Sequence, residues 1–342
     1  MRAAVAEGPR SLRLRERPRP PAPGHGQTLL RVEAVGVCGS DLHLYRAELG
    51  PSHDDLFPVV LGHEFAAVVE TPDPSGTGPD RGERVVVWPV QPCGQCRPCR
   101  TGRANVCRTL RLIGVHTDGA LQEHLVVDTP SLVAVPGLTA EQAALVEPFS
   151  IAVHTLARGR VVDGESVVVL GAGPIGVATA VAARDRGATV LLVDPVPARR
   201  DLPARLGFAV AEPDATDELR VHTGPEGPHV VVDTTGRAEV FPQAIDMAGH
   251  GGRVVVVGMT ARSAPASPGP LPLKELDVLG VSCCRRDEFA AAADLVARHT
   301  RAADTLVSHV LPLSAAADAM RLLEERPDEA FKVLIDLTGR RA

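Results

Sequence analysis

The sequence predicts an α/β protein of two domains, in which a β-rich domain precedes a doubly wound parallel sheet. Residues 1–147 carry short apolar runs separated by glycine and proline, which is typical of short strands. From about residue 165 the apolar runs lose their polar residues and alternate with helical stretches, as expected for a parallel sheet covered on both faces. With 342 residues, the chain is long enough for two domains that each have a core.

The expected strands of the β-rich part are the runs Thr28–Val35, Val59–Leu61, Arg84–Val87 and Gln122–Val127. In the second part, a strand at Ser166–Leu170 leads into a helix over Ile175–Arg186, and further strands follow at Thr189–Val193, Val230–Asp233 and Val254–Val257. The tail is expected to be helical over Asp287–Leu323 and to end in a strand at Lys332–Asp336.

Composition and charge exclude several classes of protein. The net charge is −6 and no basic block stands out, so we expect no nucleic-acid partner. Charges or glycines interrupt every apolar stretch before it reaches the length of a membrane span, and residues 1–23 lack the apolar segment of a signal peptide. Together with cysteines that are expected to be reduced, these features predict a cytoplasmic protein that does not bind membranes.

Four of the seven cysteines form the densest motif of the chain. Cys93, Cys96 and Cys99 follow the spacing C-x2-C-x2-C, and Cys107 comes shortly after them. Four thiolates within fifteen residues suit a closed tetrahedral zinc site of the structural kind. Two disulfides or a redox switch are the alternatives.

A glycine motif predicts where a dinucleotide binds. Gly171-Ala-Gly173-Pro174-Ile175-Gly176 follows a strand directly and opens a helix, which is the context the motif requires. Gly171 allows the tight turn, Gly173 lets backbone amides approach a pyrophosphate, and Gly176 lets helix and sheet pack closely. Asp194 ends the next strand and favours NAD, because its carboxylate would repel a 2′-phosphate. The nearby Arg199 and Arg200 leave NADP open. A glycine-rich turn that binds no dinucleotide is the alternative to a cofactor site.

A second group of metal-binding residue types precedes the cysteine cluster. The segments are Val37-Cys38-Gly39-Ser40-Asp41-Leu42-His43 and Gly62-His63-Glu64, and Glu147 stands before Pro148 at the domain boundary. Cys38, His63 and an acid would give zinc three protein donors and leave one position open, as catalytic sites do. A lone histidine or cysteine is usually a packing residue, but the combination with a thiolate cluster and a dinucleotide fold predicts a catalytic zinc.

Over nearly its whole length, the chain resembles the zinc-dependent medium-chain dehydrogenases/reductases of the alcohol dehydrogenase superfamily, in their polyol (sorbitol-type) branch. The motifs Ile113–Gly119, Ala144–Phe149 and His250-Gly-Gly-Arg-Val look most like those of sugar-acid 5-dehydrogenases acting on L-galactonate or L-gulonate. The resemblance implies a GroES-like catalytic domain at 1–147, to which 286–342 return, and a Rossmann NAD-binding domain at 148–285. It also implies a homotetramer or a homodimer.

The resemblance assigns roles to individual residues. Cys38, His63 and Glu64 would bind the catalytic zinc, with Glu147 binding it directly or through water, and the four-cysteine motif would bind a structural zinc. Asp41 would fix the tautomer of His63. Ser40 and His43 match proton-relay positions, although His43 could also be an ordinary surface imidazole. Tyr45 would line the substrate pocket or only pack. Further contacts with the cofactor would come from Thr235, Gly258 and Met259.

The implied reaction moves a hydride from a secondary alcohol to NAD, with zinc acidifying the hydroxyl while Ser40 and His43 remove its proton. The expected substrate is a small polyol, sugar acid or cyclitol. One departure bears on this expectation: where relatives carry a basic or amide side chain, this chain reads Ser282-Cys283-Cys284. Either Arg285 or Arg286 takes over the contact, with Arg285 expected to meet an acidic substrate, or the pocket lacks this contact. An aminocyclitol or L-threonine-type dehydrogenase is an alternative, and a non-catalytic dinucleotide-sensing protein is a remote one.

Overall fold

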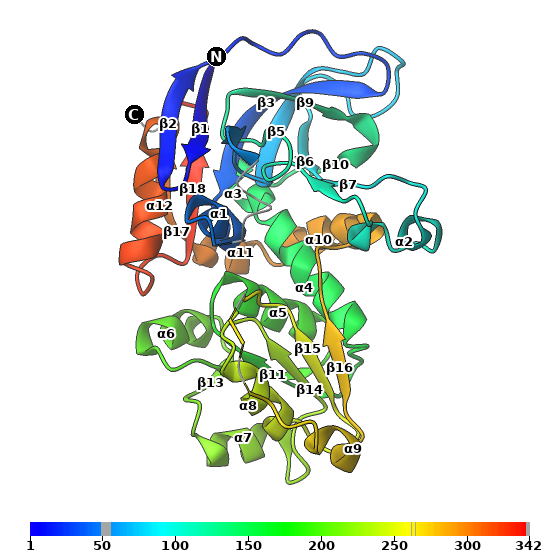
Figure 1. The fold of residues 1–342 in the computed structure, drawn as a ribbon, viewed down its shortest axis with the longest axis vertical. Helices are drawn as coiled ribbons and strands as arrows, with labels where there is room; N and C mark the ends of the chain where they lie inside the picture. Colours follow the sequence, from blue (N-terminus) through cyan, green and yellow to red (C-terminus); the bar gives the residue numbers. More distant parts are fainter. Residues whose placement is uncertain (49–55, 261, 264, 340–342) are drawn as a thin grey trace. The chain divides into compact units, whose positions relative to one another are not determined.

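The computed structural model describes residues 1–48, 56–260, 262–263 and 265–339. The chain forms two compact units (Figure 1). Unit 1 comprises Met1–Glu147 and Arg285–Ala342, and unit 2 comprises Pro148–Cys284. Within the described residues, none of the helices combines the length and apolarity that crossing a membrane requires.

Unit 1 is built mainly from short strands. In its N-terminal part the strands are β1 (Arg2–Gly8), β2 (Ser11–Glu16), β3 (Gln27–Gly36), β4 (Val59–Val60), β5 (Glu64–Thr71), β6 (Arg84–Val87), β7 (Val90–Gln91), β8 (Arg111–Leu112), β9 (His124–Asp128) and β10 (Leu132–Ala134). The helices there are α1 (Gly39–Tyr45), α2 (Arg97–Arg100), α3 (Ala140–Ala144) and the start of α4 (Val146–Arg158). The returning segment adds α10 (Arg286–Arg298), α11 (Thr300–Leu306), β17 (Val307–Pro312), α12 (Ala316–Glu325) and β18 (Lys332–Asp336).

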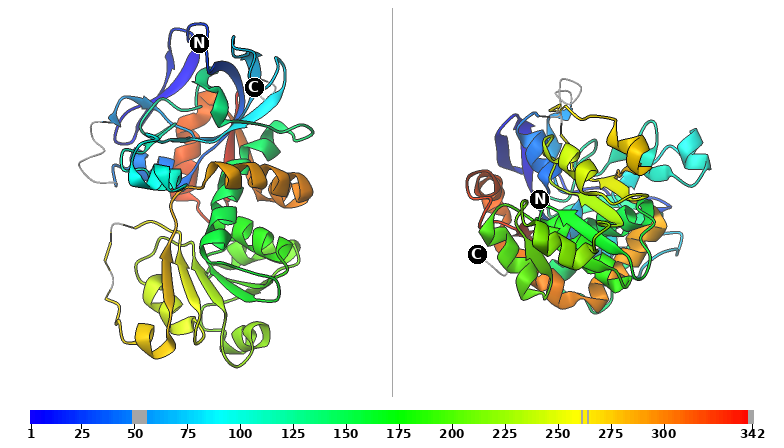
Figure 2. Two further views of the ribbon diagram at one scale, coloured as in Figure 1. Left: turned by 90° about the vertical axis from the view of Figure 1, so that its right-hand side faces the viewer. Right: turned by 90° about the horizontal axis from the view of Figure 1, so that it is seen from below.

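Strand β3 organises unit 1. It pairs antiparallel with β5, with β9 and with β18, so segments from both ends of the chain meet along it. Figure 2 shows the orange and red C-terminal segments lying among the blue and green ones of the N-terminal part. The side chains of β3 are almost all buried, which explains the long apolar run seen in the sequence. Gly36 at its end lies opposite Glu64 on one side and Leu334 on the other.

The expectation of a helical tail is wrong at one place. The chain between α11 and α12 forms β17, which pairs parallel with β18. The sequence Val-Ser-His-Val-Leu-Pro supplies β-branched residues but too short a run to show a clear period. The partner strand β18 is itself buried, and its free edge decides the structure of this segment.

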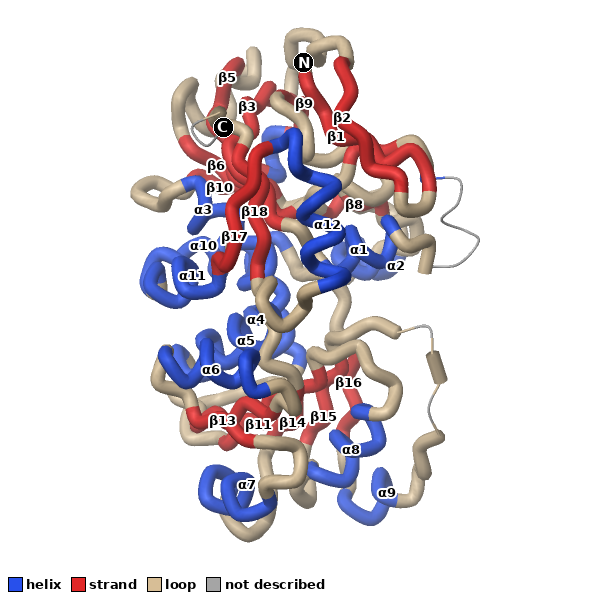
Figure 3. The backbone as a smooth tube through the Cα atoms, turned by 90° about the vertical axis from the view of Figure 1, so that its left-hand side faces the viewer, coloured by secondary structure: helices blue, strands red, loops and turns tan. Residues whose placement is uncertain are grey.

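Unit 2 has a parallel sheet of strand order β13-β12-β11-β14-β15-β16 among the described residues. The strands are β11 (Ser166–Leu170), β12 (Thr189–Val193), β13 (Ala209–Ala211), β14 (Val230–Asp233), β15 (Arg253–Val256) and β16 (Asp277–Gly280). The helices are α5 (Pro174–Asp185), α6 (Pro197–Arg205), α7 (Thr216–Thr223), α8 (Val240–Met247) and α9 (Pro270–Lys274). Figure 3 shows α5 and α6 on one side of the sheet and α7 and α8 on the other. The order reverses between β11 and β14, which is the position where such sheets bind nucleotides.

A buried carboxylate ties three loops of unit 1 together. Asp73 is 3% exposed, and its oxygens accept hydrogen bonds from the Gly26 amide at 3.0 Å, the Ser75 amide at 2.8 Å and the Thr129 hydroxyl at 2.9 Å. The hydroxyl and the amide of Ser75, followed by the other donors, hold the pKa of Asp73 far below its ordinary value.

We expect Asp73→Ala to lower the melting temperature of the protein at neutral pH. The stabilisation from a lowered folded-state pKa is complete above the unfolded value of about 3.9 and is lost as pH falls toward the folded value. The difference between wild type and variant should therefore shrink below about pH 4. Thermal unfolding at a series of pH values measures it, with the exposed Asp80→Ala as control. A difference that stays constant down to the acid limit would contradict this expectation.

Candidate active site and metal centres

Cys38 owes its position to a tight junction between β3 and α1. It is the N-cap residue of α1, with φ −95° and ψ 157°, and its backbone amide donates to Asp41 Oδ2 at 2.9 Å. The other oxygen of Asp41 accepts the Gly62 amide at 3.3 Å. Asp41 is 1% exposed and thus links the loop that carries Cys38 to the loop that carries His63.

His63 and Glu64 enter the site at the start of β5. The two side chains are buried, and His63 Nδ1 lies 3.6 Å from Asp41 Oδ1, an ion-pair distance. Ser40 Oγ lies 3.3 Å from His63 Nε2. Glu64 approaches Gly36 so closely that a Cβ atom at Gly36 would lie 2.3 Å from Glu64 Oε2. The glycine at the end of β3 is therefore required by the carboxylate beside it.

The donor atoms of Cys38, His63 and Glu64 all lie within 4.8 Å of one another. Among the described residues, His63 Nδ1 is one of the buried polar atoms that lack a hydrogen-bond partner. Burial disfavours charge on His63, but Asp41 and Cys38 outweigh it and hold the pKa of His63 well above its ordinary value. A thiolate, an imidazole and a carboxylate that together attract positive charge are a donor set that fits zinc.

Glu147 is also buried, near the start of α4, but it is outside the group whose donor atoms lie within 4.8 Å. Burial raises the pKa of Glu147 to about 7, with His63 and Lys332 opposing the rise and Glu64 adding to it. Glu147 therefore lies within electrostatic range of His63, Glu64 and Lys332. Direct binding of a metal by Glu147 stays a prediction.

Three further residues that the sequence singled out have local partners. His43 Nδ1 pairs with Glu48 Oε2 at 2.8 Å. Tyr45 is 7% exposed and belongs to the hydrophobic core of unit 1, which favours its packing role. The Arg285 guanidinium pairs with Asp287 at 3.2 Å and with Glu288 at 3.1 Å, and the Glu288 carboxylate accepts the Arg285 backbone amide at 2.8 Å at the start of α10. The relay and substrate roles of these residues stay predictions.

The four-cysteine lobe brings its sulfur atoms together. Cys96 Sγ lies 3.4 Å from Cys99 Sγ and 3.8 Å from Cys107 Sγ, and the Cys93 amide lies 3.3 Å from Cys107 Sγ. Tetrahedral zinc with bonds of about 2.3 Å requires sulfur–sulfur edges of about 3.8 Å. A disulfide would need about 2.05 Å, so this geometry suits a metal and not two disulfides.

The protonation of the lobe also favours a cation. The amides of Gln95 and Cys96 lower the pKa of the Cys93 thiol to about 6. Burial, with neighbouring sulfur atoms, raises the pKa of Cys99 to about 12. One thiolate forms readily and makes the next harder to form, until a metal ion compensates the charge.

In unit 2 the glycine motif occupies the turn between β11 and α5. Gly171 has φ +96°, and a Cβ atom there would meet Thr234 Oγ1 at 2.7 Å. A Cβ atom at Gly176 would lie 1.9 Å from the Gly171 carbonyl oxygen, so only glycine lets the helix begin here. Gly173 caps α5, with Pro174 as the first helical residue and Ile175 after it, and the space beside its Cα is open. The helix thus offers free amides where a pyrophosphate would bind.

Asp194 stands at the end of β12 and is 3% exposed. One carboxylate oxygen accepts the Ala172 amide at 2.8 Å and the other accepts the Val196 amide at 2.9 Å. Arg200 donates to the Asp194 carbonyl at 2.7 Å and to Glu212 at 2.6 Å, while Arg199 is half-buried on α6. Asp194 therefore holds the glycine loop and keeps a negative charge beside it.

The remaining cofactor candidates lie after β14 and β15. Thr235 donates its amide and hydroxyl to Asp233 Oδ1, at 2.9 and 2.7 Å. A Cβ atom at Gly258 would lie 2.1 Å from the Gly236 nitrogen, so the two loops pack closely. Met259 is 60% exposed. All three follow the carboxyl ends of parallel strands, where nucleotides bind in such sheets.

The sequence analysis missed Lys332, the first residue of β18. It is 4% exposed, and its ammonium contacts Glu64 Oε1 at 2.9 Å and Oε2 at 2.7 Å. Burial disfavours its charge, but Glu64 and Cys38 raise the pKa of Lys332, so it is an ammonium. A signal did exist, because the chain has only two lysines and this one opens an apolar strand.

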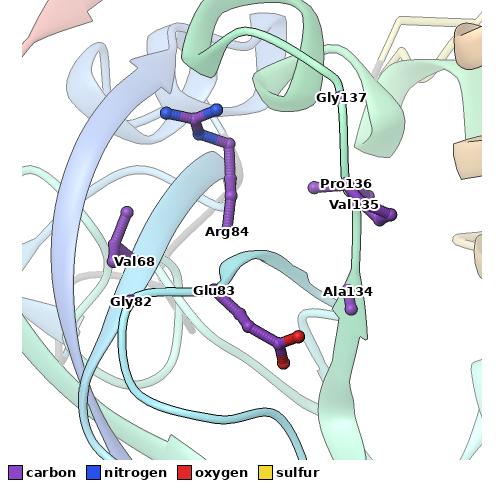
Figure 4. A pocket seen from close by; sticks show the side chains of 8 residues that line it. All are labelled: Val68, Gly82, Glu83, Arg84, Ala134, Val135, Pro136 and Gly137. Atoms are coloured by element: carbon purple, nitrogen blue, oxygen red, sulfur yellow. The ribbon is translucent and has the colours of Figure 1, made fainter.

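A surface pocket of about 310 Å³ in unit 1 lies apart from these sites (Figure 4). Its lining consists of Val68, Gly82, Glu83, Arg84, Ala134, Val135, Pro136 and Gly137, none of which belongs to a metal group. The guanidinium of Arg84 is already bound to Glu33 at 2.9 Å and to the Leu138 carbonyl at 2.7 Å.

Comparison with known proteins identifies the family. Residues 24–137 match the alcohol dehydrogenase GroES-like domain, and residues 174–298 match the zinc-binding dehydrogenase domain. The L-galactonate-5-dehydrogenase of Escherichia coli K12 is 32% identical, and the match covers 93% of this chain and 94% of that protein.

Two solved structures share the fold. One is a short chain alcohol dehydrogenase of Escherichia coli CFT073 complexed with NADH, with 29% identity, a TM-score of 0.88 and coverage of 98% of this chain and 99% of that one. The other is a putative zinc-binding dehydrogenase of Sinorhizobium meliloti bound to NADP, with 32% identity, a TM-score of 0.87 and coverage of 98% of both chains. The chain belongs to the zinc-dependent medium-chain dehydrogenases/reductases and is an NAD(P)-dependent oxidoreductase with a GroES-like domain and a Rossmann domain.

Proposed function

We propose that the protein oxidises a secondary hydroxyl group of a small polyhydroxylated molecule, such as a polyol, sugar acid or cyclitol, with NAD as hydride acceptor. The observation that carries this proposal is the buried group of Cys38, His63 and Glu64, with donor atoms within 4.8 Å of one another. The relative named L-galactonate-5-dehydrogenase supports a sugar acid as the first substrate class to test.

Zinc held by Cys38, His63 and Glu64 would make a bound hydroxyl acidic, and a second zinc held by the four-cysteine lobe would be structural. The protein side chains then handle the proton. Ser40 Oγ lies beside the His63 ring and relays the proton, accepting that of the substrate hydroxyl while it passes its own onward. His43 is the next base, and Glu48, paired with His43 Nδ1, leaves Nε2 to hold the proton.

NAD is the proposed cofactor because Asp194 keeps a buried negative charge beside the glycine loop. The 2′-phosphate of NADP would be repelled by this charge. Arg200 does not offset the effect for a ligand, since Glu212 and the Asp194 carbonyl already bind its guanidinium.

We expect Asp194→Asn to lower the preference for NAD over NADP by at least about tenfold in kcat/KM, a change of about 1.4 kcal/mol. The amide oxygen of asparagine can still accept one of the two backbone amides that Asp194 binds, so the variant removes the charge and one hydrogen bond. Initial rates with each cofactor measure the ratio, and Asp201→Asn, exposed on α6, is the control. An unchanged ratio would mean that Asp194 does not select the cofactor.

The function is tested with protein that carries two zinc ions per chain. Sugar acids, alditols, cyclitols, L-threonine and primary alcohols are each offered with NAD, and NADH formation is followed. We expect turnover with secondary alcohols that carry several hydroxyl groups. Turnover with L-threonine or an aminocyclitol alone would favour those alternatives, and no turnover with any alcohol would overturn the proposal.

The place of Arg285 is part of the same proposal. Its ion pairs with Asp287 and Glu288 already give it a structural role. If Arg285 also contacts an acidic substrate, Arg285→Ala raises KM for sugar acids but not for neutral polyols. An unchanged KM for sugar acids in Arg285→Ala would assign Arg285 to its ion pairs alone. The thiolate ligands of this function require a reducing compartment, so we propose the cytoplasm, and the assembly into dimers or tetramers stays a prediction.

A further inference from the structure

The ammonium of Lys332 has three hydrogen-bonding partners in the interior of unit 1. It donates to Glu64 Oε1 at 2.9 Å, to Glu64 Oε2 at 2.7 Å and to the Val37 carbonyl at 3.2 Å. An ammonium has three protons, so these contacts use all of its donors. The Lys332 and Glu64 side chains are 5% and 0% exposed. This ion pair is shielded from water and is not a surface contact.

The fold places this pair beside the metal group by joining distant segments. Glu64 opens β5 and lies opposite Gly36, and Leu334 on the strand of Lys332 lies opposite the same glycine. The Val37 amide donates to the Val333 carbonyl at 2.9 Å, which fixes β18 next to the loop that carries Cys38. Lys332 is thus held by backbone pairing and does not reach the site by side-chain flexibility.

Charge gives the pair a consequence for metal binding. A buried carboxylate without a partner is strongly unfavourable, and Lys332 removes this cost for Glu64. The same positive charge opposes a divalent cation nearby and reduces the donor strength of the carboxylate. Among Cys38, His63 and Glu64, the thiolate of Cys38 therefore offers the metal an uncompensated negative charge, whereas Lys332 compensates the charge of Glu64.

We propose that Lys332 is a positioning residue of the metal site, which holds Glu64 by both oxygens and thereby limits how strongly this carboxylate binds the metal. With Glu64 restrained, the open position needed for a substrate hydroxyl is kept. This inference deepens the proposed function and rests on it for its catalytic consequence, but its effect on metal affinity does not depend on any substrate.

Two single variants and their combination test the charge argument. Lys332→Met frees Glu64, and we expect zinc to bind at least about tenfold more tightly. Glu64→Gln leaves the ammonium uncompensated, and zinc should bind at least about tenfold more weakly. The double variant K332M/E64Q has the net charge of wild type but lacks the carboxylate, and its affinity should lie clearly above that of Glu64→Gln and below that of Lys332→Met.

Affinity is measured as zinc competition with a chromophoric chelator on the full chain. The zinc that belongs to this site is identified as the binding step that is missing from the titration of Cys38→Ala. Lys332→Arg keeps the charge and should keep both zinc affinity and kcat near the wild-type values. In Lys332→Met, kcat with the best substrate should fall by at least about tenfold, because the freed Glu64 carboxylate can then bind the metal through its second oxygen as well and fill the open position.

The signs of the two shifts decide the outcome. If Lys332 only anchors β18, both single variants weaken zinc binding and the double variant weakens it further, which overturns the proposal. If Lys332→Met does not fold, two comparisons remain. Glu64→Gln should bind zinc more weakly than wild type, and the double variant should bind it more tightly than Glu64→Gln. If the zinc affinities of the variants change as expected but no alcohol is oxidised, only the proposed function is contradicted. If the enzyme is active but both single variants change zinc affinity in the same direction, only this inference is contradicted.

Discussion

Replacing Cys38 with alanine is expected to reduce turnover by at least about 10³-fold, which corresponds to about 4 kcal/mol of lost transition-state stabilisation. Cys38 supplies the thiolate of the group whose donor atoms lie within 4.8 Å. Without it, His63 and Glu64 remain, and Lys332 already pairs with Glu64. The site should therefore lose its metal while the fold persists, because Cys38 is only half-buried. Initial rates and zinc content per chain measure both effects.

The zinc content separates loss of the site from general damage. Cys38→Ala should keep the zinc of the four-cysteine lobe and fall from about two to about one zinc per chain. Cobalt substitution gives a further readout, since the thiolate band of the catalytic site should disappear while that of the lobe remains. A variant that still binds two metal ions, or that still turns over at the wild-type rate, would show that Cys38 is not a ligand.

Replacing Cys96 with alanine is expected to disorder the lobe between residues 93 and 107. Its sulfur lies 3.4 Å from Cys99 Sγ and 3.8 Å from Cys107 Sγ, so its loss removes one corner of the thiolate cluster. Structural zinc in small metal-dependent domains contributes about 10–16 kcal/mol at neutral pH, and the lobe has little else to hold it, because Cys93 is exposed and α2 is only four residues long. Limited proteolysis should cut the variant within the lobe, and thermal unfolding should begin at a lower temperature.

Thr101→Ala is the matched control in the same lobe. The Thr101 hydroxyl donates only to backbone carbonyls, Arg97 at 3.0 Å and Pro98 at 3.2 Å, and the residue is exposed. Its removal should change stability by about 0.5–1.5 kcal/mol at most. Protease resistance of Cys96→Ala equal to that of Thr101→Ala would show that the lobe does not depend on a metal.

The local motifs could be predicted from the sequence because their geometry is set by neighbouring residues. The four cysteines span fifteen residues, and any compact folding of that segment brings the sulfur atoms together. The turn Gly171–Gly176 is likewise determined within six residues, since a Cβ atom at Gly176 would collide with the Gly171 carbonyl. The buried strands of unit 2 were also recognisable, because strands covered on both faces carry no polar residue in their interior.

Other features depend on partners that are remote in sequence. β17 was expected to be helix and became a strand because β18 offers it an edge. Asp41 likewise accepts the amide of Gly62, 21 residues away, and so joins the loop of Cys38 to that of His63. In each case a neighbour in the fold, and not the residue's own propensity, decided the role.

The sequence by itself indicated the two groups of candidate metal ligands, the dinucleotide turn and the change from short strands to a parallel sheet. These follow from spacing and hydrophobic period, which act over a few residues. Only the tertiary structure decided how the catalytic group is charged. Glu64 and Lys332 are separated by 268 residues and meet because β5 and β18 both pair with β3. The pairing of strands from both ends of the chain thus brings the buried ammonium of Lys332 onto the carboxylate of Glu64.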